Sequence, residues 1–143
     1  MLKIECNEQR PRFETEPLAD GRTLVRLYED EEEASRPAVS DMDTPWNGYS
    51  YTTYETQIAL PTGALDAAPD TWADAVKQAD CAQAAVQVRA ERDRLISACD
   101  WTVLDDAKTD KQAWATYRQA LRDVPEQPGF PYDVSWPAMS EQL

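Results

Sequence analysis

Apolar and polar residues alternate along much of the first sixty residues, the pattern of β-strands that bury one face. Residues 1–9 are either a short strand or an unordered lead. Strands are expected at residues 12–17 and 23–29, because the Ala-Asp-Gly sequence between them suits a tight hairpin turn with positive φ angles. Val25 and Leu27 mark the more apolar face of the second strand. Prolines on both sides of the first strand predict that it lies at a sheet edge.

Residues 29–33 are a run of acidic side chains. Like charges repel at this spacing, so we expect a solvated loop, followed by a polar linker at residues 34–45. The run lacks the alternating ligands and the glycine of a calcium-binding loop, which argues against a metal site. Residues 46–60 predict one or two further strands, with an Asn-Gly turn near their start, and residues 61–69 are a second linker.

Four aromatic side chains gather in this second strand region: Trp46, Tyr49, Tyr51 and Tyr54. They either fill the core of the β lobe or form an exposed patch, because aromatic residues are enriched in small cores and in interfaces alike. Packing in the core is the simpler alternative. If the patch is exposed, its three tyrosines are candidate partner-binding residues.

A long amphipathic helix is expected from Thr71 to about Asp100, because apolar residues recur there at every third or fourth position. Thr71 and Asp74 have the spacing of a capping pair. The stripe is rich in alanine, so the helix is expected to pair with another helix, within the chain or in a second copy. The stripe comprises Trp72, Val76, Ala79, Ala82, Val86 and Ala90, continued by Leu95, Ile96 and Cys99.

A second helix is expected to begin near the Thr109 and Gln112 capping pair and to run to about Asp123. Trp101, Val103 and Leu104, in the connection, are expected to pack between the two helices. The residues predicted to hold the two helices together are Trp72, Val76, Leu95, Ile96, Trp101, Leu104 and Leu121.

Residues 124–137 hold four of the ten prolines, which excludes an α-helix and predicts an extended, preorganised hook. Phe130, Tyr132, Val134 and Trp136 alternate in the hook, so one of its faces is apolar. The hook either folds back on the helices or docks into a partner, because an ordered apolar surface needs to be covered.

Composition narrows the class of protein. The chain has 143 residues and a net charge of −13, with the acidic residues concentrated in the first half. Nucleic acids and anionic membranes would repel such a chain. No apolar run is long enough for a signal peptide or a membrane span. The three cysteines are odd in number, which fits a reducing cytoplasm better than a disulfide framework.

The residues that usually carry catalysis are missing or isolated. The sequence has no histidine, no Cys-x-x-Cys pair and no glycine-rich phosphate loop. The carboxylate pairs Asp41/Asp43 and Asp105/Asp106 arise easily by chance among 27 acidic residues. We therefore expect a binding protein without a cofactor or metal, not an enzyme.

Residues 89–137 resemble the tail assembly chaperones, or tail fibre assembly proteins, of tailed bacteriophages and prophages. The resemblance implies a non-enzymatic protein that binds a tail fibre or another tail component and helps it fold, oligomerise or attach; some members stay on the particle. The matching segments are Arg92-Asp93-Arg94-Leu95-Ile96, Asp100-Trp101-Thr102, Ala113-Trp114, Tyr117-Arg118-Gln119-Ala120-Leu121-Arg122-Asp123, Gln127-Pro128-Gly129-Phe130-Pro131 and Trp136-Pro137.

The predicted fold is α+β: a small antiparallel β lobe in residues 1–69, then a two-helix hairpin with an extended hook in residues 70–143. The predicted function is that of a tail fibre assembly chaperone in the cytoplasm of the bacterial host. The alternatives are a stoichiometric tail component that is retained in the virion and, more remotely, an acidic inhibitor that mimics nucleic acid. Self-association through the long helix is a further expectation. The candidate partner-binding residues are Tyr49, Tyr51, Tyr54, Trp114, Tyr117, Arg118, Phe130, Tyr132 and Trp136.

Overall fold

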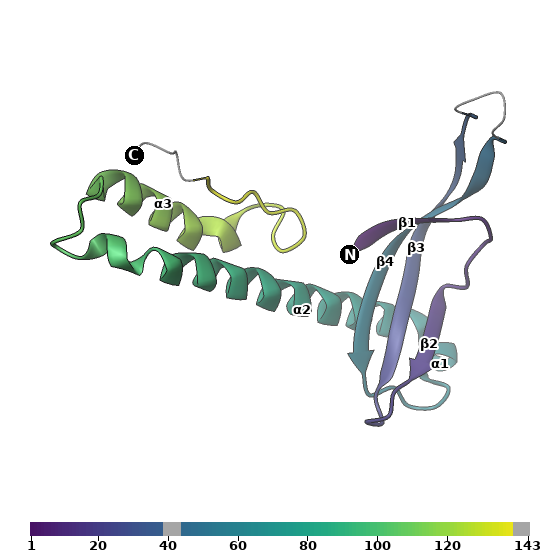
Figure 1. Cartoon of the computed structure of the whole chain (residues 1–143). Helices are drawn as coiled ribbons and strands as arrows, with labels where there is room; N and C mark the ends of the chain where they lie inside the picture. Colours follow the sequence, from purple (N-terminus) through teal and green to yellow (C-terminus); the bar gives the residue numbers. More distant parts are fainter. Residues whose placement is uncertain (39–43, 139–143) are drawn as a thin grey trace. The chain divides into compact units, whose positions relative to one another are not determined.

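The protein combines a four-stranded antiparallel sheet with helices that follow it in the chain (Figure 1), which confirms the predicted α+β class. The computed structural model describes residues 1–38 and 44–138. The sheet order is β1-β4-β3-β2. The strands are β1 (Leu2–Cys6), β2 (Phe13–Pro17), β3 (Thr23–Arg36) and β4 (Trp46–Ile58). The helices are α1 (Ala64–Ala67), α2 (Pro69–Ala98) and α3 (Lys111–Asp123), with 3₁₀ turns η1 (Asp100–Val103) and η2 (Val124–Glu126).

By its internal contacts the chain divides into two units, Met1–Asp80 and Cys81–Leu143. The dividing point lies inside α2, so the first turns of this helix belong with the sheet. The sequence analysis placed a boundary earlier, between residues 69 and 70. Each unit is described below by itself.

The hairpin between β2 and β3 forms where the sequence predicts it, and β2 lies at the edge of the sheet. Gly21 adopts a φ of 82°, and its amide donates to the Leu18 carbonyl at 3.1 Å. The Leu18 amide in turn donates to the carbonyl of Arg22 at 2.9 Å. Only the glycine of the Asp-Gly pair has a positive φ, so one left-handed residue is enough to reverse this chain.

The acidic run was predicted to be a loop, and this prediction is wrong. The run is part of β3, which continues to Arg36. Residues 29, 32 and 33 pair with β4, and three of the five carboxylates of the run have partners within the unit. Glu29 pairs with Arg12 at 3.1 Å and with Lys77, and Glu32 pairs with Lys3 at 3.3 Å. Glu31 accepts hydrogen bonds from Gln9 at 2.7 Å and from Tyr51 at 3.0 Å. Residues 39–43 of the predicted linker lie outside the described residues. They include the carboxylate pair Asp41 and Asp43.

The predicted Asn47-Gly48 turn is also wrong, because both residues belong to β4 and pair with Ser35 and Ala34 of β3. Gly48 is needed for its small size. A Cβ atom there would lie 2.2 Å from the Cys6 carbonyl oxygen and 2.5 Å from the Trp46 ring. The glycine therefore lets β1 and an indole approach the backbone of β4 more closely than any side chain would allow.

The core of the first unit lies between the sheet and the start of α2. Val25 and Leu27 are fully buried on the face that the alternation predicts, and Ala73 and Val76 cover them from the helix. The sequence analysis assigned Val76 to the contact between two helices. The structure places it against the sheet instead, because the sheet offers the larger apolar surface to this part of α2. Trp72, assigned to the same contact, is half-buried. Four partly buried side chains complete the core: Phe13, Tyr54, Ile58 and Leu60.

In the second unit, α3 runs back beside the C-terminal part of α2 (Figure 1). Its N-cap is Asp110, whose carboxylate accepts from the amides of Gln112 at 3.0 Å and Ala113 at 3.1 Å. Thr109, the predicted cap, donates instead to the Thr102 carbonyl at 3.3 Å. An aspartate is as good a cap as a threonine, so the start of the helix moves by one residue. Leu121 is fully buried, whereas Leu95 and Ile96 are half-buried.

The stripe on α2 differs from the predicted one. Ala85 is buried, whereas Ala82, Val86 and Ala90 are exposed. The exposed residues lie within the described part of the chain and leave an apolar strip on the helix. Self-association through this strip stays a prediction.

Residues 124–137 were predicted to be extended throughout, but residues 124–133 fold into η2 and a series of tight turns, and only residues 134–137 have no regular structure or turn. Phe130 donates its amide to the Gln127 carbonyl at 3.0 Å, and Tyr132 and Asp133 both donate to the Gly129 carbonyl, at 2.9 and 2.8 Å. The Phe130-Pro131 bond is cis. Turns of this kind use few amide donors, so prolines are as compatible with them as with an extended chain.

Candidate functional site

Three aromatic rings form two edge-to-face pairs in the second unit, with Trp114 shared by both. The Trp101 and Trp114 rings lie 6.0 Å apart, and those of Trp114 and Tyr117 lie 5.8 Å apart, centre to centre. Trp101 comes from η1 and the other two from successive turns of α3. Edge-to-face pairs contribute about 0.5–1.5 kcal/mol beyond the area they bury. This aromatic cluster (Trp101, Trp114, Tyr117) therefore helps to fix the connection against α3.

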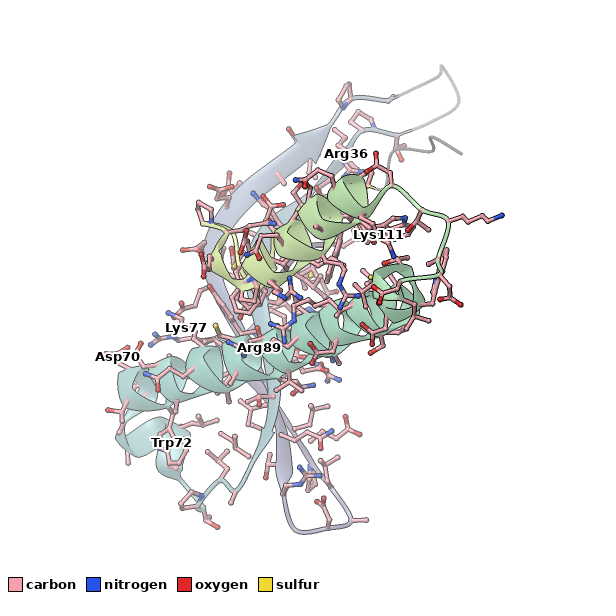
Figure 2. All side chains as sticks on the ribbon, turned by 90° about the vertical axis from the view of Figure 1, so that its left-hand side faces the viewer. Arg36, Asp70, Trp72, Lys77, Arg89 and Lys111 are labelled. Atoms are coloured by element: carbon pink, nitrogen blue, oxygen red, sulfur yellow. The ribbon has the colours of Figure 1, made fainter. Side chains whose placement is uncertain are left out.

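The connection nevertheless exposes most of its apolar side chains. Trp101 is 53% exposed, Val103 58% and Leu104 56%. We call these three residues the apolar tip. The sequence analysis expected them to pack between the helices. The structure shows that polar atoms hold this turn, because Lys111 donates from Nζ to the carbonyl oxygens of Thr102, at 3.0 Å, and Leu104. Figure 2 shows Lys111 at the start of α3. The apolar side chains are left free to face outward.

A shallow pocket of about 410 Å³ lies on α3 beside the apolar tip. We call it the α3 pocket. Its apolar side chains are Val103, Trp114 and Ala115, and its basic ones are Lys111, Arg118 and Arg122. Two uncharged polar residues complete the lining. A lining of apolar and aromatic side chains with a few polar groups is typical of ligand pockets.

Arg118 was predicted to contact a partner, but its guanidinium is engaged inside the unit. Nη1 lies 3.1 Å from the Ile96 carbonyl oxygen and 3.2 Å from the Cys99 Sγ, and Nη2 lies 2.8 Å from Asp100 Oδ1. The side chain is only 12% exposed. The hydrogen bond to Asp100 raises the pKa of Arg118. The arginine thus ties α3 to the C-terminal end of α2, where a positive charge is also favoured by the helix dipole.

The predicted hook residues separate into two groups. The Arg89 guanidinium lies 5.1 Å from the centre of the Phe130 ring, a cation–π contact within the unit. Tyr132 is half-buried. Trp136 is 37% exposed and remains available to a partner. The structure therefore brings Phe130 onto α2 and leaves Trp136 at the surface.

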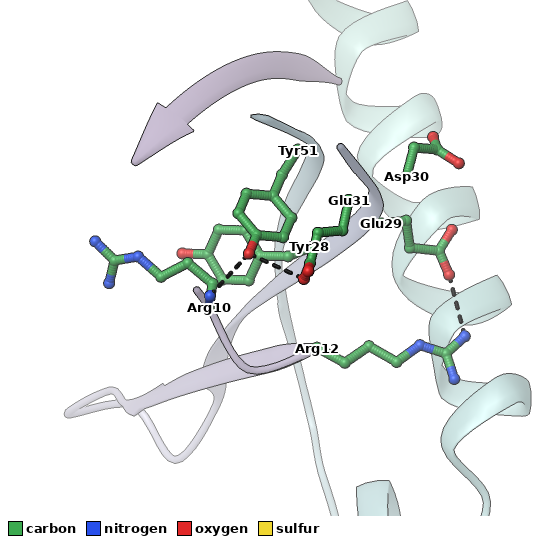
Figure 3. A pocket seen from close by; sticks show the side chains of 7 residues that line it. All are labelled: Arg10, Arg12, Tyr28, Glu29, Asp30, Glu31 and Tyr51. Atoms are coloured by element: carbon green, nitrogen blue, oxygen red, sulfur yellow. Dashed lines mark hydrogen bonds and ion pairs between the residues drawn. The ribbon is translucent and has the colours of Figure 1, made fainter. Parts of the chain in front are cut away.

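The three candidate tyrosines of β4 do not form one patch. Tyr51 and Tyr49 share a sheet face with Tyr28, with ring centres 5.8 Å apart for Tyr28–Tyr51 and 6.5 Å for Tyr49–Tyr51. Tyr54 lies on the opposite face, against the core. Tyr51 is almost fully buried; its hydroxyl accepts from the Arg10 amide at 2.9 Å and donates to Glu31 (Figure 3). Odd and even positions of a strand point to opposite faces, so Tyr49 and Tyr54 cannot form one surface.

Tyr28 makes the sheet sensitive to alkaline pH. Burial, and then its 2.7 Å hydrogen bond to Glu14, raise the pKa of Tyr28 from 10.0 to about 12. Between these values the unfolded chain releases the proton and the folded chain keeps it, so the free energy of unfolding should fall as pH rises from 10 to about 12. Urea titrations at stepped pH measure this slope. In Tyr28→Phe the free energy of unfolding should fall less steeply over the same pH range. An unchanged slope would show that Tyr28 does not cause the pH dependence.

The described residues contain no cluster of three or more His, Cys, Asp or Glu side chains that could hold a metal ion. Over the same ranges, no helix has the length and apolar character needed to cross a membrane. Cys6, Cys81 and Cys99 are free thiols.

Sequence reasoning missed the α3 pocket. Its signal is present in the helical spacing of Lys111, Trp114, Arg118 and Arg122, because steps of three and four residues place side chains on one helix face. Trp114 and Arg118 were predicted as partner contacts, but they were not grouped with Lys111 and Arg122 into one surface. The exposure of the apolar tip carries no such signal.

Comparison with known proteins identifies the region that holds these features. Residues 85–140 match the family model described as phage tail assembly chaperone protein. The match contains the aromatic cluster, the apolar tip and the α3 pocket, and it leaves the sheet outside. No curated protein and no solved structure matches the chain. The resemblance seen in the sequence is thus confirmed over residues 85–140, where the chain matches the model of the phage tail assembly chaperone family.

Proposed function

We propose that this protein is an assembly chaperone for a tail fibre of a bacteriophage or prophage, and that it acts by binding, without catalysis. The observation that carries the proposal is the apolar tip. It exposes three large apolar side chains inside the segment that matches the chaperone family. Exposed apolar groups that lie together mark interaction sites.

The physical task of such a chaperone is to cover surface on an unassembled fibre. Unpaired strand edges and apolar surface on a fibre chain that has not yet oligomerised favour wrong pairing and aggregation. Trp101 and its neighbours can cover such surface because they are already exposed and need no rearrangement. A rigid aromatic anchor loses little conformational entropy on binding. The chain would then act in the cytoplasm of the host cell, where the fibre is made.

Co-expression tests the proposal. The tagged chain is expressed with the tail fibre gene of the same locus, and the eluted complex is weighed by light scattering. We expect a complex of defined mass and more soluble fibre than without the chain. A clean monomer, with no fibre bound and no gain in fibre solubility, would refute the proposal.

Trp101→Ala should weaken that complex by about 2 kcal/mol, the effect of removing an aromatic anchor from an interface. The free fold should survive because the side chain is more than half exposed. Leu2→Ala is the control, since Leu2 is a large exposed apolar residue of β1, in the other unit and outside the residues that match the family model. Equal affinities for the Trp101 and Leu2 variants would mean that the tip does not contact the fibre.

Purified phage particles separate the chaperone from a structural tail component. Mass spectrometry of purified particles should find the chain absent or in trace amounts, whereas one copy or more per fibre would favour the component. The inhibitor that mimics nucleic acid has less support, because the carboxylates of Glu29, Glu31 and Glu32 already have partners within the sheet unit.

A further inference from the structure

We propose that the α3 pocket accepts a segment of the partner in which an apolar side chain is flanked by carboxylates. This deepens the proposed function, on which it rests for the identity of the partner as a tail protein. The occupant is recognised by two features of the pocket together, its charge and its apolar floor.

The charge of the pocket is opposite to that of the protein. The chain carries 27 acidic and 14 basic residues, yet all the charged residues that line the pocket are basic. No aspartate or glutamate belongs to the lining as far as the structure describes it. Such a local reversal of sign attracts carboxylates at short range, while the acidic remainder of the surface discourages basic segments.

The three cations of the pocket have different tasks. Lys111 is bound to carbonyl oxygens of the connection, and Arg118 is bound to Ile96, Cys99 and Asp100. Arg122 is exposed, and no hydrogen bond or ion pair within the described residues engages it. Arg122 is therefore the cation that a partner carboxylate can reach at the lowest cost, as a planar donor suited to a two-point hydrogen bond.

The floor of the pocket supplies the apolar half of the recognition. Trp114 is held there by edge contacts with Trp101 and Tyr117, so its position is fixed before binding. Val103, from the apolar tip, also lines the pocket. A volume of about 410 Å³ has room for a large apolar side chain and the backbone beside it.

An aromatic floor with basic neighbours also suits the bases and phosphates of single-stranded nucleic acid. The protein's net charge of −13 makes that occupant unfavourable, because each phosphate brought to the surface is repelled by the remainder of the chain. A peptide brings only a few charges, so we commit to the acidic, apolar peptide segment.

Fluorescence anisotropy of labelled probes tests the inference on the full chain. The first probe is the peptide Gly-Asp-Glu-Phe-Leu-Glu-Asp-Gly, and the second replaces each of its acidic residues with lysine. The third is an oligothymidylate of similar length. We expect saturable binding of the acidic probe alone, weakened by added salt.

Arg122→Glu should weaken binding of the acidic probe at least about tenfold, because the contact becomes repulsive. Arg94→Glu is the matched control. It makes the same charge change at an exposed arginine of α2 that pairs with Glu91 and does not line the pocket. Circular dichroism confirms that both variants are folded.

Four outcomes would each overturn the inference. Three concern the probes: no binding of the acidic probe, equal binding of the acidic and lysine probes, or tighter binding of the oligothymidylate. The fourth is an equal effect of the two variants. These outcomes are independent of the co-expression result. A fibre complex that survives Arg122→Glu would leave the proposed function intact and refute only the role of the pocket. Binding of the acidic probe without any fibre complex would refute the function and leave the pocket.

Discussion

Replacing Gly129 with alanine should lower the free energy of unfolding by about 3 kcal/mol, the upper range for overpacking a tight site. A Cβ atom at this position would lie 2.2 Å from the Asp133 carbonyl oxygen and 2.9 Å from the Asp133 Cβ. Both are closer than real Cβ contacts, and one of the atoms belongs to the backbone, which cannot rotate away. The turn must open, and the hydrogen bonds from Tyr132 and Asp133 to the Gly129 carbonyl then lengthen.

Urea unfolding followed by far-ultraviolet circular dichroism measures this loss. Gly63→Ala is the control, because Gly63 has a φ of 73° but no atom within 4 Å of the added Cβ. That variant carries only the strain of a left-handed alanine, about 1 kcal/mol. If Gly129→Ala is no less stable than Gly63→Ala, the turn at residues 127–133 is not packed as described.

Arg118→Ala should destabilise the protein by about 2 kcal/mol, the range for hydrogen bonds that involve a charged group. The change removes the donor to the Ile96 carbonyl and the partner of Asp100 in one step. Ile96 lies in the last turn of α2 and Asp100 begins η1 directly after it, so α3 loses polar contacts with both elements. Arg118→Lys should recover part of the loss, because an ammonium group restores the charge but not the planar set of donors.

Arg122→Ala is the matched control for the stability measurement. It removes the same side chain from the same helix one turn later, at an exposed position, and should change the free energy of unfolding by less than about 0.5 kcal/mol. Similar losses for the two alanine variants would show that Arg118 holds no special place between the helices. Because Arg122 lines the α3 pocket and Arg118 joins the helices, the pair also separates binding from stability.

Elements that depend on local interactions could be predicted from the amino-acid sequence alone. The hairpin at Gly21, the buried face of Val25 and Leu27, and the end of α3 at Asp123 all follow from turn chemistry and from the period of apolar residues. The motif of residues 89–137 was enough to indicate the family that the comparison finds over residues 85–140. The hairpin, the buried face and the end of α3 each depend on residues that are close together in the chain, and the motif is one continuous stretch.

Features that depend on partners distant in the chain could not be predicted before the fold was known. Residues 29–33 belong to a strand because they pair with β4, and Lys3, Gln9, Tyr51 and Lys77 provide partners for three of its carboxylates. The tyrosines of β4 are divided between two faces by the pleat of a strand whose register is set by its neighbours, β1 and β3.

The candidate site shows the same division. The sequence shows that the residues of the apolar tip are apolar, but it does not show whether they are exposed. Their exposure depends on what contacts the connection once α3 has folded back. There Lys111 donates hydrogen bonds to the carbonyl oxygens of the turn. Arginine is common in contacts with partners, so Arg118 was predicted to be one. Its guanidinium instead binds within the unit, to the Ile96 carbonyl in the last turn of α2 and to the Asp100 carboxylate in η1. Periodicity encodes which face of an element is apolar; only the assembled fold determines whether that face is covered.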